Sequence, residues 1–109
     1  DVLLMHAEAL TEAGILAEAL TSLNLVRTRA GLPASKAATQ AELREAIRTE
    51  RRMELYLEGH RWFDLVRHGT LVSTMKAKGK TSIEEKHTKF PIPLREIDTN
   101  PALTQNPGY

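Results

Sequence analysis

Two glutamates one helical turn apart are the residues of this chain that are best placed for chemistry. Glu50 and Glu54 lie in a segment whose apolar residues recur at helical spacing. At about 100° per residue, both carboxylates fall in the stripe that faces inward. Two carboxylates on one face can act as general acid and general base, so one hypothesis is a hydrolase that uses this pair. The apolar members of the stripe are Leu43, Ala46, Ile47 and Leu57.

An internal ion-pair lattice is the alternative interpretation of the same two carboxylates, and we favour it. A buried carboxylate without a partner costs several kcal/mol, so both need cations nearby. Arg51 and Arg61 are candidates within the segment, and Arg27 and Arg29 are candidates on the preceding helix. No Ser–His–Asp order, Gly-rich phosphate loop or metal motif accompanies the carboxylates. The opposite face is expected to be solvated surface and carries Arg44, Arg48 and Arg52.

A possible metal site follows at His60, Asp64 and His68, which are spaced four residues apart. Neighbouring members of this row can share a metal ion. All three cannot, because positions eight residues apart are separated by about 12 Å along a helix axis. No fourth ligand is in view, so we expect no metal, and His68 is better interpreted as a helix C-terminal residue favoured by the helix dipole.

Aromatic side chains are the other candidates for ligand contact. Trp62 and Tyr56 lie close to the glutamate pair in sequence. An exposed aromatic ring can stack on the apolar face of a sugar, whereas packing into a core is the more common role. The sequence leaves these two roles open.

The elements that must position these residues are mainly helical. Apolar residues predict a helix over 2–12 and a second over 15–30, with Gly14 and Gly31 as their stops. These helices form a tetratricopeptide-like hairpin over residues 1–31, and such a unit needs neighbours to bury both faces. Charged helices are expected over 39–69. The first is a long helix over 40–58, preceded by a Thr39–Glu42 capping box, and the second covers 60–68.

The last part of the chain is expected to be irregular. Residues 70–89 are weakly patterned and lysine-rich, which predicts a loop. Residues 90–109 contain four prolines and predict an extended, turning tail with apolar anchors. The fold class is therefore mainly α: a tetratricopeptide-like hairpin, a long helix and a Pro-rich extended tail.

Composition limits the classes of function. The chain has 109 residues, of which 41% are hydrophobic and 27% are charged, and its net charge is +1. This balance fits a soluble globular class and gives no bulk attraction to nucleic acid. Cysteine is absent, which excludes disulfides and thiolate sites within this chain. Acidic residues dominate positions 1–26 and basic residues dominate 27–80, so these parts either pack together or are both solvated. Because the chain opens inside an apolar helical pattern, we expect a fragment of a larger α-helical-repeat protein.

Three motifs together resemble the SusD-like (RagB/SusD) family. Residues 50–55 read ERRMEL and residues 58–67 read EGHRWFDLVR, which is similar to the family signature. The tail, with FPIP at 90–93, EI at 96–97, NP at 100–101 and QNPGY at 105–109, is similar to the C-terminal end of the family. LNLVR at 23–27 and RAGL at 29–32 resemble the preceding helix. The resemblance covers nearly the whole chain and marks 1–109 as a C-terminal segment.

The resemblance implies a cell-surface role in polysaccharide utilisation. Family members are outer-membrane lipoproteins that bind oligosaccharides or other nutrients and cover a SusC-like TonB-dependent transporter. They are not enzymes, and no cofactor is implied. Their membrane attachment is an N-terminal lipid on a cysteine that this chain lacks. No residue here inherits a ligand-binding role. The motif positions carry over as a structural ion lattice: Glu50, Arg51, Glu54, Glu58, Arg61, Asp64 and Arg67.

A free-standing helical-repeat module that binds a protein partner is the rival hypothesis. It requires neither a lipid anchor nor a sugar, and it predicts binding along the concave helix faces.

Overall fold

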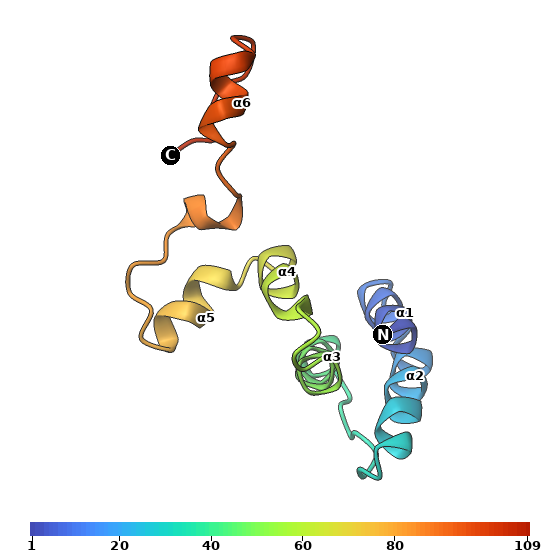
Figure 1. Ribbon diagram of the computed structural model, residues 1–109. Helices are drawn as coiled ribbons and strands as arrows, with labels where there is room; N and C mark the ends of the chain where they lie inside the picture. Colours follow the sequence, from blue (N-terminus) through green and yellow to red (C-terminus); the bar gives the residue numbers. More distant parts are fainter. The chain divides into compact units, whose positions relative to one another are not determined.

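The computed structural model describes residues 1–109 as an all-helical chain that forms two compact units, residues 1–61 and 62–109 (Figure 1). It contains six α-helices, one short 3₁₀ helix and no strand. None of the helices combines the length and the apolar character that crossing a membrane requires. The mainly α fold class is therefore confirmed.

The first unit begins with a helical hairpin. Helix α1 (Val2–Glu12) and helix α2 (Leu16–Arg29) pack against each other, and both contact α3 (Gln40–Glu54). Gly14 makes the tight turn possible because its φ of +78° lies in the left-handed region. The Ile15 N–H then donates to the Leu10 carbonyl at 2.9 Å, which closes the end of α1.

The core of this unit lies where the three helices meet. Ala7 of α1 and Ala19 of α2 are fully buried, and these small side chains let the two helix backbones approach closely. Larger aliphatic side chains fill the space between the hairpin and α3. The buried core residues are Leu4, Ala7, Ala19, Leu23, Val26, Leu43 and Ile47.

Helix α3 starts where the sequence predicts and ends four residues earlier. Its first turn carries the predicted capping box, in which the Thr39 side chain accepts from the Glu42 N–H and the Glu42 carboxylate accepts from the Thr39 N–H. The helix ends at Glu54 and not at residue 58. Leu57 adopts a left-handed φ of +68° and is 88% exposed, so its placement in the inward stripe is wrong. Leu57 lies beyond the end of α3, so its position on a helical wheel does not apply.

The second unit contains helices that the sequence pattern did not predict. Helix α4 (His60–Arg67) begins at the junction of the units and agrees with the predicted helix. The segment 70–89, predicted as a loop, contains helix α5 (Leu71–Ala77) and the 3₁₀ helix η1 (Glu85–Thr88). Helix α5 forms because Leu71 is buried at its first position, although its single apolar turn is too short to give a periodic signal.

The proline-rich tail also contains a helix. Helix α6 (Leu94–Thr99) lies between Pro93 and Pro101, so the prolines bound this helix and do not interrupt it. On either side the tail is irregular, as predicted. Gln105 fixes it by accepting from the Ile92 N–H at 2.8 Å and donating to the Ile92 carbonyl at 2.9 Å.

Candidate functional site

The candidate site is a set of ion pairs that joins α2 and the start of α1 to α3. Glu50 lies on the inward face of α3 and is only 3% exposed. Nη1 of Arg27, on α2, donates to Oε2 of Glu50 at 2.7 Å. Nε of the same arginine donates to the Pro33 carbonyl at 2.9 Å. This guanidinium therefore links α2, α3 and the segment that connects them.

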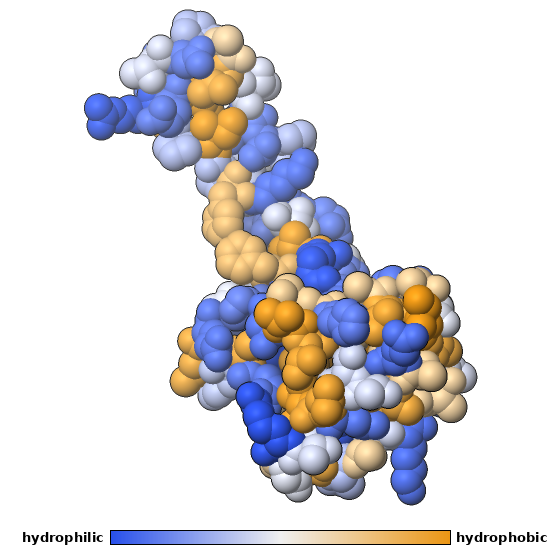
Figure 2. Space-filling view, turned by 90° about the vertical axis from the view of Figure 1, so that its right-hand side faces the viewer, coloured by the Kyte–Doolittle hydropathy of each residue, from blue (hydrophilic) through white to orange (hydrophobic).

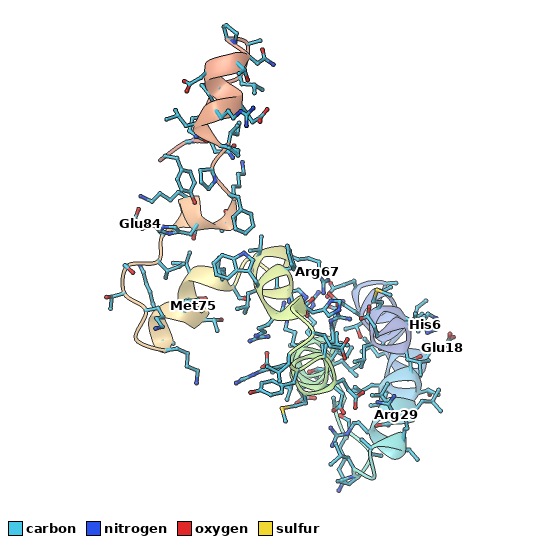
Figure 3. The ribbon with its side chains drawn as sticks, in the orientation of Figure 1. His6, Glu18, Arg29, Arg67, Met75 and Glu84 are labelled. Atoms are coloured by element: carbon cyan, nitrogen blue, oxygen red, sulfur yellow. The ribbon has the colours of Figure 1, made fainter.

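A second pair lies one turn further along α3. Arg29 lies in the last turn of α2 (Figure 3). It donates from Nη2 to Oε2 of Glu54. The Arg29 side chain is 70% exposed and that of Glu54 is 22% exposed. Solvent therefore screens this pair more than the Arg27–Glu50 pair, and we expect it to contribute less to stability.

Arg51 connects α3 to the start of α1. Its side chain is 5% exposed, and Nη1 donates to Oδ1 of Asp1 at 2.6 Å. Asp1 occupies the N-cap position of α1, where a carboxylate also interacts favourably with the helix dipole. Arg51 is among the predicted partners of the glutamates, whereas in the structure its Nη1 donates to this aspartate.

Arg44 forms an ion pair that the sequence interpretation missed. Its Nε and Nη2 atoms donate to the two carboxylate oxygens of Glu12 at 2.7 and 2.6 Å. These hydrogen bonds lower the pKa of Glu12 and raise the pKa of Arg44. Arg44 does lie on a solvated face, with 38% of its side chain exposed, but this face also carries an ion pair that was not predicted. The available signal was the acidic first segment beside the basic second one, which left packing between them open.

The remaining predicted lattice residues lie at or beyond the end of α3. Glu58 and Arg61 are exposed, and Oε2 of Glu58 is 4.0 Å from Nε2 of His60. Asp64, in the second unit, is buried and accepts from Nη2 of Arg67 at 2.9 Å. The structure thus places Glu50, Arg51 and Glu54 on α3 and Asp64 and Arg67 on α4. Their role as a lattice stays a prediction.

The geometry also bears on the catalytic and metal hypotheses. Each carboxylate of the Glu50–Glu54 pair accepts a hydrogen bond from its own arginine, as the ion-pair interpretation requires. No group of three His, Asp or Glu side chains is close enough to hold a metal ion. Every buried side-chain nitrogen or oxygen has a hydrogen-bond partner.

The aromatic candidates differ in exposure. Trp62 is partly buried, whereas its neighbour Phe63 is 66% exposed. Tyr56, in the turn that follows α3, is 73% exposed. Other large apolar side chains are exposed on the first unit, and Figure 2 shows apolar patches on the face that carries α1 and α2. The exposed large apolar residues of these two helices are Val2, Leu3, Met5 and Leu25.

Comparison with known proteins gives one consistent result over the whole chain. The model of the SusD family matches residues 1–109. SusD-like protein P25 of Formosa agariphila is 38% identical over 123 residues, which cover 100% of this chain and 23% of that protein. Starch-binding protein SusD of Bacteroides thetaiotaomicron is 32% identical over 117 residues and is covered to 20%.

A solved structure agrees with the sequence relatives. A SusD superfamily protein from Bacteroides vulgatus superposes with a TM-score of 0.89 at 36% identity. The match covers 99% of this chain and 26% of that one. The chain therefore spans about a quarter of the length of the relatives that it matches.

Proposed function

Because this chain belongs to the SusD family, we propose that it is the C-terminal segment of a cell-surface protein that binds glycans or other nutrients. The observation that carries this proposal is the family match over residues 1–109, together with the relative whose name describes starch binding. In the proposed mechanism, the whole protein captures an oligosaccharide by aromatic stacking and hydrogen bonds. It then passes the ligand to a SusC-like TonB-dependent transporter in the outer membrane. We propose no catalytic reaction.

We propose that residues 1–109 supply scaffold to this protein. The ion pairs support this role, since Arg27 and Arg29 join α2 to α3 and Arg51 joins α3 to the N-cap of α1. A paired charge in a helix interface specifies one helix register, because a shifted register would leave a charge unpaired. The lattice residues Glu50, Arg51 and Glu54 are thus proposed to position helices and not to touch ligand.

The membrane location follows from the same family assignment. We propose that the whole protein is held at the outer membrane by an N-terminal lipid, which leaves the binding domain at the cell surface.

A protein-interaction module is the second candidate, and the exposed apolar side chains of the hairpin favour it. Val2 is 72% exposed and Leu25 is 55% exposed. Apolar patches on a folded surface commonly mark contact sites for protein. The two candidate functions differ in the partner: in the first the whole protein binds a glycan or other nutrient, and in the second this segment binds a protein.

The direct test is a binding assay on the full reading frame that carries this segment. Soluble starch and a panel of other soluble polysaccharides would be cast into native gels, in which binding retards migration. We expect retardation by at least one polysaccharide, and none for residues 1–109 alone. If the full protein migrates normally in every gel and binds none of the panel by calorimetry, the glycan proposal is wrong. Retardation of residues 1–109 alone would contradict the scaffold assignment.

A further inference from the structure

The short helix η1 begins with a reciprocal cap in which a histidine replaces the usual acidic or amide side chain. The Glu84 N–H donates to Nδ1 of His87 at 2.8 Å. In return, the Glu84 carboxylate accepts from the backbone N–H of His87. Glutamate or glutamine ordinarily occupies this third position of a capping box. Figure 3 shows Glu84 at the start of this turn.

This hydrogen bond fixes the state of the imidazole. A backbone N–H can only donate, so Nδ1 must be an acceptor, and the ring is neutral with its proton on Nε2. Protonation of the ring converts Nδ1 into a donor, which cannot accept from the Glu84 N–H. Histidine side chains change charge between about pH 5 and pH 8, whereas a glutamate at this position would remain an acceptor throughout that range.

The same turn holds the last residues of the chain. The Tyr109 hydroxyl is directed at the carbonyls of Lys89, at 2.9 Å, and Lys86, at 3.2 Å. The rings of His87 and Tyr109 meet edge to face, with centroids 6.4 Å apart. Gly108 approaches so closely that an added Cβ would lie 3.0 Å from Cβ of Lys86. Opening the turn therefore removes the surface on which residues 107–109 rest.

Two charged groups of the same turn lie near the imidazole in sequence: the Glu84 carboxylate and the Lys86 ammonium, which are 3.4 Å apart. On the side of the tail, the facing titratable group is the phenol of Tyr109. Glu85 and Lys89 lie on the same turn.

We propose that His87 is a pH-sensitive latch for residues 107–109. When the ring is neutral, the cap at η1 is closed and Tyr109 is held. When the ring is protonated, the cap opens and residues 107–109 are released. The tail stays attached upstream, because the bonds of Gln105 to Ile92 and of Asn106 to the Phe90 carbonyl involve no group that titrates in this range. This inference does not depend on the proposed function.

The experiment is a nuclear magnetic resonance titration, from pH 8 to pH 5, of the full protein that carries this segment. After correction for intrinsic exchange, we expect the solvent exchange of the Glu84 amide to rise about three- to tenfold at the acidic end. The heteronuclear NOE of Tyr109 should fall over the same range, while that of Ile92 should not. His87→Gln keeps an acceptor that does not titrate, so it should abolish both changes. His87→Ala should show the open state at every pH.

Three results would overturn the proposal. The first is a Glu84 amide whose exchange is independent of pH in the unmodified chain. The second is a change that persists in His87→Gln, which would assign it to a titrating group other than His87. The third is a Tyr109 that stays rigid while the Glu84 amide opens, which would mean that the protonated ring forms a new pair with the Glu84 carboxylate and keeps the tail in place.

Discussion

Arg27 and Glu50 form the most buried ion pair between two helices of the first unit, with Nη1 and Oε2 2.7 Å apart. The pair is asymmetric, because 4% of the Glu50 side chain is exposed whereas 23% of the Arg27 side chain is. The carboxylate therefore depends on the guanidinium for its solvation, while the guanidinium retains water and the Pro33 carbonyl as other partners. Loss of the arginine and loss of the carboxylate charge are thus not equivalent.

Neutralising Glu50 is expected to destabilise the fold. Glu50→Gln should lower the free energy of unfolding by about 1–3 kcal/mol, because the partly buried Arg27 guanidinium loses its charged acceptor. Glu54→Gln should cost less than about 1 kcal/mol, since Arg29 is mostly in water. Urea unfolding followed by circular dichroism gives both values. Equal costs for the two variants would contradict this ranking. If the protein hydrolyses a substrate, and if Glu54→Gln abolishes that hydrolysis without lowering stability, the hydrolase hypothesis would be favoured instead.

The sequence was sufficient for features that local physics decides. The two-helix hairpin follows from apolar spacing and two glycines, and the Thr39–Glu42 cap follows from residue types three positions apart. The need for arginine partners follows from the cost of burying Glu50. Which arginine pairs with Glu50 depends on how the helices pack. The sequence alone left Arg27, Arg29, Arg51 and Arg61 as alternatives.

The features that escaped prediction depend on packing between distant segments. Arg44 faces away from the apolar stripe, yet it reaches Glu12, which is 32 residues earlier in the chain. Helix α5 has one buried apolar residue at its start, which no periodic pattern reveals. Helix α3 ends at Glu54, and no residue between there and Gly59 is a helix breaker. The residue types therefore predicted a helix that continues to residue 58.

The left-handed backbone at Leu57 is expected to carry strain that a glycine would relieve. Leucine at φ +68° costs about 1–2 kcal/mol relative to glycine, which has no Cβ. The side chain is exposed, so its removal loses little burial. Leu57→Gly should therefore raise the free energy of unfolding by about 0.5–1 kcal/mol after the entropy of glycine is subtracted.

Leu57→Ala is the matched control, because it removes most of the side chain and keeps the Cβ. Its free energy of unfolding, measured in urea, should stay within about 0.5 kcal/mol of that of the unmodified chain. A large loss of stability in the alanine variant would show that the Leu57 side chain packs against something.

The Thr39 cap is expected to stabilise the start of α3. Thr39→Ala removes the side-chain oxygen that accepts from the Glu42 N–H and should cost about 1 kcal/mol. Thr39→Ser keeps that oxygen and should cost much less. Thermal unfolding of the three proteins at one pH compares them directly. If alanine and serine give the same melting temperature, the observed capping box does not contribute to stability.

The Glu12–Arg44 pair should make stability depend on pH in a defined direction. Hydrogen bonds from Arg44 lower the pKa of Glu12 below its ordinary value of 4.5, so the folded state binds this proton less readily than the unfolded state does. The resulting stabilisation is fully present above pH 4.5 and is lost as the pH falls through the lower folded-state pKa. The measurement is the difference in unfolding free energy between the unmodified chain and Glu12→Gln, taken from pH 7 to pH 2. We expect the unmodified chain to be the more stable at pH 7, and this difference to disappear at the acidic end. Arg44→Gln is the control, because without the guanidinium the same comparison should show no such step.

Since the pair is exposed, 1 M salt should shrink the difference in unfolding free energy between the unmodified chain and Glu12→Gln. A difference that survives at pH 2 would contradict an electrostatic origin and would assign the effect to packing of the side chain.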